Sequence, residues 1–292
     1  MDFVVGATGT VGGEICALLT KEGRKVRGLV RPQSDPGRVA ELKKLGVEVF
    51  EGDLKDSAWM AGACKGVENM YTTASALPVP KEGDEIHSVD LAGQKNLIAA
   101  AKSAGVKNIV YTSFPRYDDV HFPLGDAKNA IEEAIRASGV DYTILQASFF
   151  NETWLSAAVG FDWASGAVRI YGDGDQKVAF IAAKDLAKYA VASPSNAAVK
   201  NRVVKVGGPE SVTPNAVAKM FEAAGKPLKV EHVPESALQE QLAGADNDVM
   251  KSFLGLMIAI SRGDRVDTAA ARAAYPNVEL TKVGEFVKQM TS

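Results

Sequence analysis

A glycine-rich turn near the start of the chain constrains the fold more than any other feature of the sequence. Residues 6–12 read Gly-Ala-Thr-Gly-Thr-Val-Gly, between the apolar run Phe3–Val5 and a helix-like segment over residues 13–20. In such a strand-turn-helix unit, the first glycine permits a tight turn, the second lets backbone N–H groups approach a ligand, and the third lets the helix pack closely on the strand. The N–H groups and dipole at the helix start favour phosphate groups. The turn therefore predicts a dinucleotide-binding βαβ unit.

Short β-branched runs alternate with amphipathic helical stretches through the first half of the chain. This order is typical of an α/β fold, in which a doubly wound parallel sheet is covered by helices on both faces. The helical patterns begin near Val11, Pro36, Ser57, Val89 and Asp126. The expected strands are Phe3–Val5, Lys25–Val30, Glu48–Glu51, Asn69–Thr73, Asn108–Thr112 and Tyr142–Gln146.

The alternation breaks beyond residue 150. Residues 165–176 are rich in glycine and aspartate and read as turns, and the remainder after residue 224 reads as mostly helical. We therefore expect a dinucleotide-binding (Rossmann) domain over residues 1–150 and a smaller mixed substrate-cleft region over residues 151–292. Ser211 or Thr213 is expected to cap one of the later helices. The later elements expected are a strand at Val168–Tyr171, helices at Ala183–Ala192 and Val212–Ala224, and strand-like stretches near residues 179–182 and 203–206 that are candidates to return to the first sheet.

The residue that follows the second strand indicates which dinucleotide is bound. An NAD-binding unit usually has an acidic residue there, whose carboxylate accepts a hydrogen bond from the ribose 2′-OH. This chain instead has Arg31, in Gly28-Leu-Val-Arg-Pro32. A guanidinium donates parallel, charged hydrogen bonds that suit a 2′-phosphate. The cofactor expected is NADP(H); an ordinary surface arginine is the alternative interpretation of Arg31.

Residues after the third and fourth strands complete the expected cofactor site. Asp53 is placed to accept a hydrogen bond from the adenine amino group, although a plain turn would also accommodate an aspartate there. Small residues after the fourth strand would let the cofactor lie against the backbone. The residues predicted to bind the cofactor from these motifs are Gly6, Thr8, Gly9, Thr10, Val11, Gly12, Arg31, Asp53, Leu54, Thr73, Ala74 and Ser75.

Five motifs together resemble the NmrA-like atypical short-chain dehydrogenase/reductase family. They are Gly-Ala-Thr-Gly-x-x-Gly, Leu-Val-Arg-Pro, Glu-Gly-Asp-Leu, Val-Lys-Asn-Ile-Val-Tyr-Thr-Ser and Tyr-Thr-Ile-Leu-Gln, at residues 6–12, 29–32, 51–54, 106–113 and 142–146. The stretch from Ile258 to Phe286 is similar to the tail of the quinone reductase and triphenylmethane reductase branch. The resemblance implies an NADP(H)-binding Rossmann domain and a small C-terminal domain that closes over a substrate cleft.

The resemblance also indicates catalytic positions. Short-chain dehydrogenases of the usual kind use Ser, Tyr and Lys, with the last two spaced as Tyr-x-x-x-Lys. Ser113 matches the serine and Lys128 matches the lysine, but Leu124 stands at the tyrosine position. We expect Lys128 to bind the nicotinamide ribose and Ser113 to donate to a substrate oxygen; a solvated helix lysine and a strand-end cap are the alternatives. Tyr117 and His121 are other candidate proton donors.

The missing tyrosine restricts the substrate. A plain ketone needs a proton donor as hydride arrives, because the alkoxide product is a strong base. A quinone gives a delocalised anion whose conjugate acid has a pKa near that of a phenol, roughly 10. Such an anion can take its proton from water, and a cationic dye needs none. The sequence therefore favours a quinone-like or conjugated acceptor.

Aromatic residues near the strand ends predict a small apolar or aromatic substrate, since ligands bind where a doubly wound sheet opens its crevice. Phe149 is expected to contact the cofactor as well. His87 and His232 lack neighbours at metal-ligand spacing, so no metal site is predicted. The residues predicted to line the substrate are Phe114, Phe122, Phe150 and Trp154.

Composition excludes several other classes of function. A net charge of −3 gives no basic footprint for nucleic acid. No run approaches the roughly 20 apolar residues that span a bilayer, and no signal peptide is visible. Cys16 and Cys64 are too few for a disulfide framework, which indicates the cytoplasm. Whether the protein is a monomer or a dimer stays open.

The sequence leaves competing functions. The first is an NADPH-dependent oxidoreductase that reduces a quinone-like acceptor. The second is a redox sensor of the NmrA type that binds NADP(H) without turnover, which the missing tyrosine also suits. A sugar-nucleotide epimerase or dehydratase is disfavoured, because that chemistry also uses the tyrosine.

Overall fold

The computed structural model describes residues 1–77, 83–264 and 266–292. Their backbone forms two compact units, each assembled from several stretches of the chain. The first unit contains residues 1–114, 124–146 and 186–204, and the second contains residues 115–123, 147–185 and 205–292.

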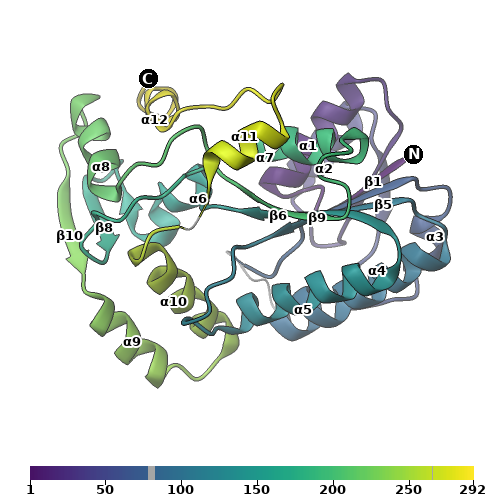
Figure 1. Cartoon of the computed structure of the whole chain (residues 1–292), viewed down its shortest axis with the longest axis horizontal. Coiled ribbons are helices and arrows are strands. Elements are labelled where there is room, and N and C mark those ends of the chain that lie inside the picture. The colour runs from purple at the N-terminus through teal and green to yellow at the C-terminus, as the bar shows by residue number, and fades with distance from the viewer. Residues whose placement is uncertain (78–82, 265) are drawn as a thin grey trace. The chain divides into compact units, whose positions relative to one another are not determined.

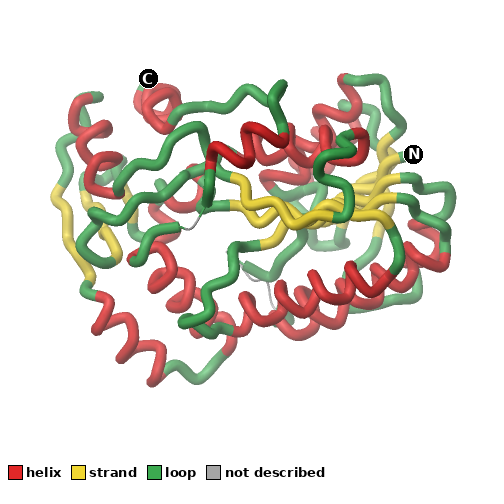
Figure 2. Tube along the Cα trace, viewed as in Figure 1, coloured by secondary structure: helices red, strands yellow, loops and turns green. Residues whose placement is uncertain are grey.

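The first unit is built on the expected parallel sheet. Seven strands lie in the order β3-β2-β1-β4-β5-β6-β9, and the pairs from β3 to β6 are parallel. The order reverses at β1, as in a doubly wound fold, and the carboxyl ends of β1 and β4 flank that point. Figure 2 shows the strands of this sheet in yellow between helices in red. The strands are β1 (Asp2–Val5), β2 (Val26–Val30), β3 (Glu48–Glu51), β4 (Asn69–Thr72), β5 (Asn108–Ser113), β6 (Asp141–Ala147) and β9 (Arg202–Val206).

Helices cover both faces of this sheet, with α4 and α5 along one face and α1 and α2 on the other (Figure 1). The helix α5 buries Leu124, Ala127, Ile131 and Ile135, the 3.6-residue apolar stripe that drives its packing. A π-helix, η1 (Ile86–Gly93), runs directly into α4. The helices of this unit are α1 (Thr10–Lys21), α2 (Pro36–Lys44), α3 (Met60–Cys64), α4 (Gln94–Ser103), α5 (Pro123–Ser138), most of α7 (Ala183–Ala192) and the 3-10 turn η3 (Ser193–Ser195).

The second unit contains a small mixed sheet and most of the C-terminal helices. Its three strands lie in the order β10-β8-β7, with β10 parallel and β7 antiparallel to β8. The elements are α6 (Asn151–Trp154), η2 (Ala157–Val159), β7 (Phe161–Asp162), β8 (Ala167–Tyr171), α8 (Pro214–Ala223), β10 (Lys229–Val233), α9 (Glu235–Gly244), α10 (Asp248–Ser261), α11 (Thr268–Ala274) and α12 (Val283–Thr291).

The expected elements of the first half are all present, with ends that shift by a few residues. Of the two returning stretches, residues 203–206 join the sheet as part of β9. Residues 179–182 form no strand, since only Ile181 makes a bridge, to Phe150. The reason is that the amide of Ala179 donates to the carboxylate of Asp264, 2.6 Å away, which removes it from any strand ladder.

Two later features differ from the sequence prediction or sharpen it. The region after residue 224 was expected to be mostly helical, but residues 229–233 form the strand β10, whose exposed Lys-x-Glu side alternates with less exposed valines. Thr213 rather than Ser211 caps α8, and its hydroxyl accepts from the amide of Ala216. Among the described residues, no helix has the length and apolar character needed to span a membrane.

Candidate cofactor and active site

The glycine turn has the geometry that a phosphate cradle requires. It joins the end of β1 to the first residue of α1, Thr10. Gly6 has a φ of +88°, in the left-handed region that favours glycine, and a Cβ there would lie 2.7 Å from Oγ1 of Thr73. A Cβ on Gly12 would overlap the carbonyl oxygen of Gly6. The first and third glycines are therefore required by the fold itself.

The start of α1 is open to a ligand. Gly9 is the N-cap residue and supplies no side-chain cap, and Gly9 and Thr10 are exposed. A Cβ on Gly9 would meet only the carbonyl oxygen of Gly6, at 3.1 Å. Backbone donors at an uncapped helix start suit a pyrophosphate. The residues at this turn thus fit the cofactor that the sequence predicts, with Thr8 half-buried and Val11 buried beside them.

Arg31, predicted to bind the 2′-phosphate, lies directly after β2 and forms an ion pair within the chain. Its Nη1 donates to Oδ2 of Asp84 at 2.7 Å, and its amide donates to Oγ of Ser34. The other carboxylate oxygen of Asp84 accepts from Nζ of Lys55 at 2.8 Å. This contact raises the pKa of Lys55 above its ordinary value, so the amine is charged at neutral pH. The structure thus brings a second cation to Arg31.

Asp53, predicted to bind adenine, shapes the turn after β3. Its Oδ1 accepts from the amide of Lys55 at 2.9 Å, and its Oδ2 lies 3.4 Å from Nε2 of Gln33. The indole N–H of Trp59 donates to the Asp53 carbonyl at 2.7 Å, while Leu54 is buried. The carboxylate keeps lone pairs beyond these bonds. Its role toward adenine stays a prediction.

The buried side chain of Asp90 forms a hydrogen bond with the loop after β4. Asp90, in η1, accepts a hydrogen bond from the amide of Ala76 at 2.9 Å through Oδ2. Its Oδ1 is buried and has no hydrogen-bond partner among the described residues. Burial raises the pKa of Asp90, and the positive charge of Lys128 opposes the rise. Asp90 therefore contacts Ala76, the residue directly after the segment Thr73, Ala74 and Ser75 that is predicted to contact the cofactor.

Ser113, at the end of β5, is engaged within the first unit. Its hydroxyl donates to Oε1 of the buried Glu132 at 2.6 Å. The same oxygen accepts from Nε2 of Gln146 at 2.8 Å, and Oε2 accepts from Arg136 at 3.0 Å. A contribution of Ser113 to substrate binding stays a prediction, and Glu132 is a partner that sequence reasoning missed.

Lys128 lies one turn before Glu132 on α5 and is half-buried. Its Nζ donates to the carbonyl of Thr112 at 3.3 Å and lies 5.3 Å from the ring centroid of Tyr111. Burial lowers the pKa of Lys128, whereas the carboxylates of Asp90 and Glu132 raise it. The ammonium of Lys128 thus lies near the ring face of Tyr111 and the buried carboxylates of Asp90 and Glu132.

The tyrosine position is apolar in the structure as well as in the sequence. Leu124, in the first turn of α5, is buried with 5% of its surface exposed. Tyr117 and His121, the other candidate donors, belong to the second unit. The Tyr117 hydroxyl donates to the carbonyl of Gly263 at 3.2 Å, and His121 is exposed. A role for either residue in proton transfer stays a prediction.

The predicted aromatic residues are divided between the units. Phe114 belongs to the first unit, and the others belong to the second. Phe149 and Trp154 pack edge to face with ring centroids 4.7 Å apart. Trp154 also borders an apolar cavity of about 20 Å³, which holds no more than one water molecule. Phe122 is buried and packs against Gly255, and Phe150 is half-buried. Their contact with substrate stays a prediction.

The sequence analysis did not identify Lys55, Asp84, Asp90 or Glu132, although each contacts a predicted site residue or lies near one. Asp84 and Asp90 both follow β4. Asp84 is 53 residues from Arg31 along the chain, and Asp90 is 38 residues from Lys128. No local pattern links partners so far apart. The one available signal was position, since charged residues after strand ends and in the helix that follows them meet at the same edge of a parallel sheet.

Comparison with known proteins shows the family of the chain. Residues 3–287 match the NmrA-like family. Quinone oxidoreductase 2 of Escherichia coli is 28% identical over 270 residues, which cover 88% of this chain and 90% of that protein.

Solved structures show the same fold across the whole chain. A crystal structure of the NADPH-dependent quinone oxidoreductase of Escherichia coli, complexed with NADPH, matches with a TM-score of 0.79 and 24% identity over 100% of both chains. The triphenylmethane reductase of Citrobacter sp., complexed with NADP(H), matches with a TM-score of 0.77 and 23% identity over 99% of both chains. At this level of identity, the likeness establishes the Rossmann-like fold.

Proposed function

Because the chain belongs to the NmrA-like family, we propose that it is an NADPH-dependent oxidoreductase that transfers hydride to a quinone-like or conjugated apolar acceptor. The glycine turn and the open start of α1 would hold the pyrophosphate. Arg31, at the end of β2, would bind the 2′-phosphate. When bound, the reduced nicotinamide supplies the hydride, and the chain supplies orientation and charge.

The observation that carries the choice of acceptor is the pair Leu124 and Lys128 on α5. Leu124 is buried and apolar, so this helix offers no phenolic proton donor at its start. Lys128 holds a positive charge beside two buried carboxylates and a ring face. We propose that its ammonium binds the nicotinamide ribose and stabilises negative charge as hydride leaves for the acceptor.

An acceptor without a dedicated proton donor must form a stable product anion. Hydride transfer that forms an O–H bond at one carbonyl oxygen of a quinone gives a phenolate-type monoanion at the other oxygen, and one proton from water completes the hydroquinone. A phenol has a pKa of roughly 10, so this anion is far less basic than an alkoxide. A delocalised cationic dye becomes neutral on hydride addition and needs no proton. Both acceptor classes suit a site with Leu124 at that position.

The decisive experiment follows NADPH oxidation, as loss of reduced nicotinamide absorbance, with a panel of quinones and cationic dyes. Lys128→Ala is compared with Lys102→Ala, which removes an exposed lysine of α4. We expect turnover in the wild type, a fall of 10²-fold or more in Lys128→Ala as is typical for a lost charge-stabilising group, and no change in the control. Tight NADPH binding with no turnover on any acceptor would overturn the proposal and favour the non-catalytic NADP(H) sensor.

A further inference from the structure

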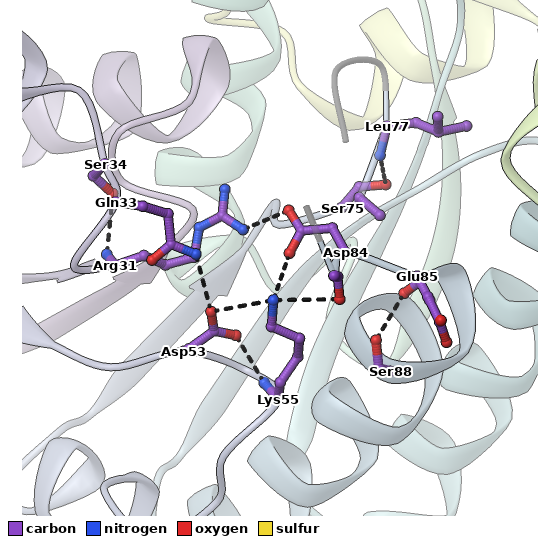
Figure 3. A network of polar contacts seen from close by, with 12 residues as sticks. Arg31, Gln33, Ser34, Asp53, Lys55, Ser75, Leu77, Asp84, Glu85 and Ser88 are labelled. Atoms are coloured by element: carbon purple, nitrogen blue, oxygen red, sulfur yellow. Dashed lines mark hydrogen bonds and ion pairs between the residues drawn. The ribbon is translucent and has the colours of Figure 1, made fainter. Parts of the chain in front are cut away.

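Four charged residues meet beside the expected adenosine end of the cofactor, and we call them the Asp84 cluster: Arg31, Asp53, Lys55 and Asp84. Figure 3 shows their side chains pointing toward one another. Nη1 of Arg31 lies 2.7 Å from one oxygen of Asp84, and Nζ of Lys55 lies 2.8 Å from the other. Nζ of Lys55 also lies 3.6 Å from Oδ2 of Asp53. One carboxylate therefore fixes the positions of two cations.

The side chains of this cluster differ in their exposure to solvent. The side chain of Asp84 is 2% exposed, whereas those of Arg31 and Lys55 are 31% and 29% exposed. The cations therefore lie between the carboxylate and solvent, and a ligand that arrives from solvent meets them first. Moving Asp84 away from both cations would leave a buried charge unpaired, which is strongly unfavourable. Asp84 is thus a permanent part of the site.

We propose that Lys55 is a second binding residue for the cofactor 2′-phosphate, and that Asp84 positions Lys55 and Arg31 for it. This inference rests on the proposed binding of NADPH. Asp84 engages one nitrogen of Arg31, and a guanidinium carries donors on two further nitrogens. An ammonium carries three donors, so Lys55 can bond Asp84 and a phosphate oxygen together. Two cations held on one carboxylate match a dianion with several acceptor oxygens.

The test measures binding of two cofactor fragments by titration calorimetry, 2′,5′-ADP and 5′-AMP, which differ by the 2′-phosphate. Neither fragment carries nicotinamide, so the result is independent of turnover. Lys55→Gln is compared with Lys43→Gln, which removes an exposed lysine of α2 in the same unit. We expect Lys55→Gln to weaken 2′,5′-ADP binding by about tenfold, as for one lost charged hydrogen bond, and to leave 5′-AMP within about twofold.

Three further results decide the proposal. Lys55→Arg keeps the charge, and we expect it to recover most of the 2′,5′-ADP affinity, which guards against a folding defect in the glutamine variant. Equal weakening of both fragments, or no weakening of either, would overturn the role of Lys55. Arg31→Ala separates this failure from failure of the proposed function: if Arg31→Ala loses the preference for 2′,5′-ADP and Lys55→Gln does not, the inference alone is wrong. If neither variant loses it, the proposed phosphate site is wrong as well.

Discussion

The hydroxyl of Ser113 donates to the carboxylate of Glu132 at 2.6 Å, and both residues are buried in the first unit. The same carboxylate oxygen accepts from Gln146 at 2.8 Å. A hydroxyl has one proton to donate, so the serine of the expected catalytic set is committed to an internal acceptor. This contact changes what a substitution at Ser113 should do.

We expect Ser113→Ala to lower the free energy of unfolding by about 1–2 kcal/mol, because the buried Glu132 loses one of its donors. Turnover should stay within about threefold of the wild type, a change below 1 kcal/mol. Chemical denaturation and NADPH oxidation with a quinone measure the two effects. If turnover falls a hundredfold while the unfolding curve is unchanged, Ser113 contacts the substrate directly and the internal bond is incidental.

The pKa of Lys128 predicts how activity depends on pH. Burial lowers this pKa below the ordinary lysine value, and the group works in the proposed mechanism as a cation. The fraction of charged Lys128 falls as pH rises through the lowered pKa. We therefore expect kcat/KM to decline on the alkaline side with an apparent pKa below the roughly 10.4 of free lysine. In Lys128→Arg the charge persists, and this decline should move to higher pH or disappear.

Asp90 offers an independent control on that assignment. Its carboxylate raises the pKa of Lys128, so its charge delays deprotonation of the lysine. Asp90→Asn removes the charge and retains an oxygen that can accept from the amide of Ala76. The alkaline decline should therefore shift to lower pH in Asp90→Asn. A decline that does not move, or that moves upward, would show that the titrating group is not Lys128.

The sequence predicts the fold well wherever a local pattern decides it. Alternating strands and helices, with a glycine turn after the first strand, were enough for the doubly wound sheet, and helix Ala183–Ala192 has the predicted bounds. The strand Lys229–Val233 was missed because a five-residue strand with charged residues resembles a loop until its partner β8 is known. Residues 179–182 look like a strand, but Asp264 takes an amide that a ladder would need.

In the candidate site, too, the sequence predicts the residues that belong to a local motif and not the residues that contact them. Gly6, Gly12, Arg31 and Lys128 were found because a motif prescribes each position. Their partners were not found, since Asp84 and Glu132 act through contacts that depend on how distant segments pack. The structure therefore adds these partners, and they orient the donors of Arg31 and Ser113.

The second and third glycines of the turn after β1, Gly9 and Gly12, allow a test that separates folding from binding. A Cβ on Gly12 would overlap the backbone carbonyl of Gly6, which cannot move without displacing the turn. A Cβ on Gly9 would lie 3.1 Å from the same oxygen and otherwise point into open space. We expect Gly12→Ala to lose roughly 3 kcal/mol or more of stability by overpacking. Gly9→Ala should stay folded and lose NADPH affinity tenfold or more, since the methyl group lies where backbone must approach the pyrophosphate.

Thermal unfolding with and without NADPH measures both glycine effects. A ligand that binds only the folded state raises the midpoint, and at a fixed ligand concentration the rise is larger for tighter binding. Gly9→Ala should unfold near the wild-type temperature without ligand and show little rise with NADPH. A wild-type rise in Gly9→Ala would mean that the pyrophosphate does not lie against this turn.

Asp84→Asn tests the charge balance around Arg31 and Lys55. One oxygen of Asp84 engages Arg31 and the other engages Lys55, and these two contacts position both cations for a 2′-phosphate. Asparagine keeps a carbonyl acceptor for one cation and removes the negative charge. We therefore expect the preference for NADPH over NADH to fall severalfold, measured as the ratio of the two dissociation constants, and stability to fall because the buried ion pairs are lost. Asp56→Asn, at an exposed aspartate of the same unit, should leave the ratio unchanged. A larger NADPH preference in Asp84→Asn would mean that the charge of Asp84 mainly repels the phosphate and that Asp84 does not position Arg31 and Lys55 for it.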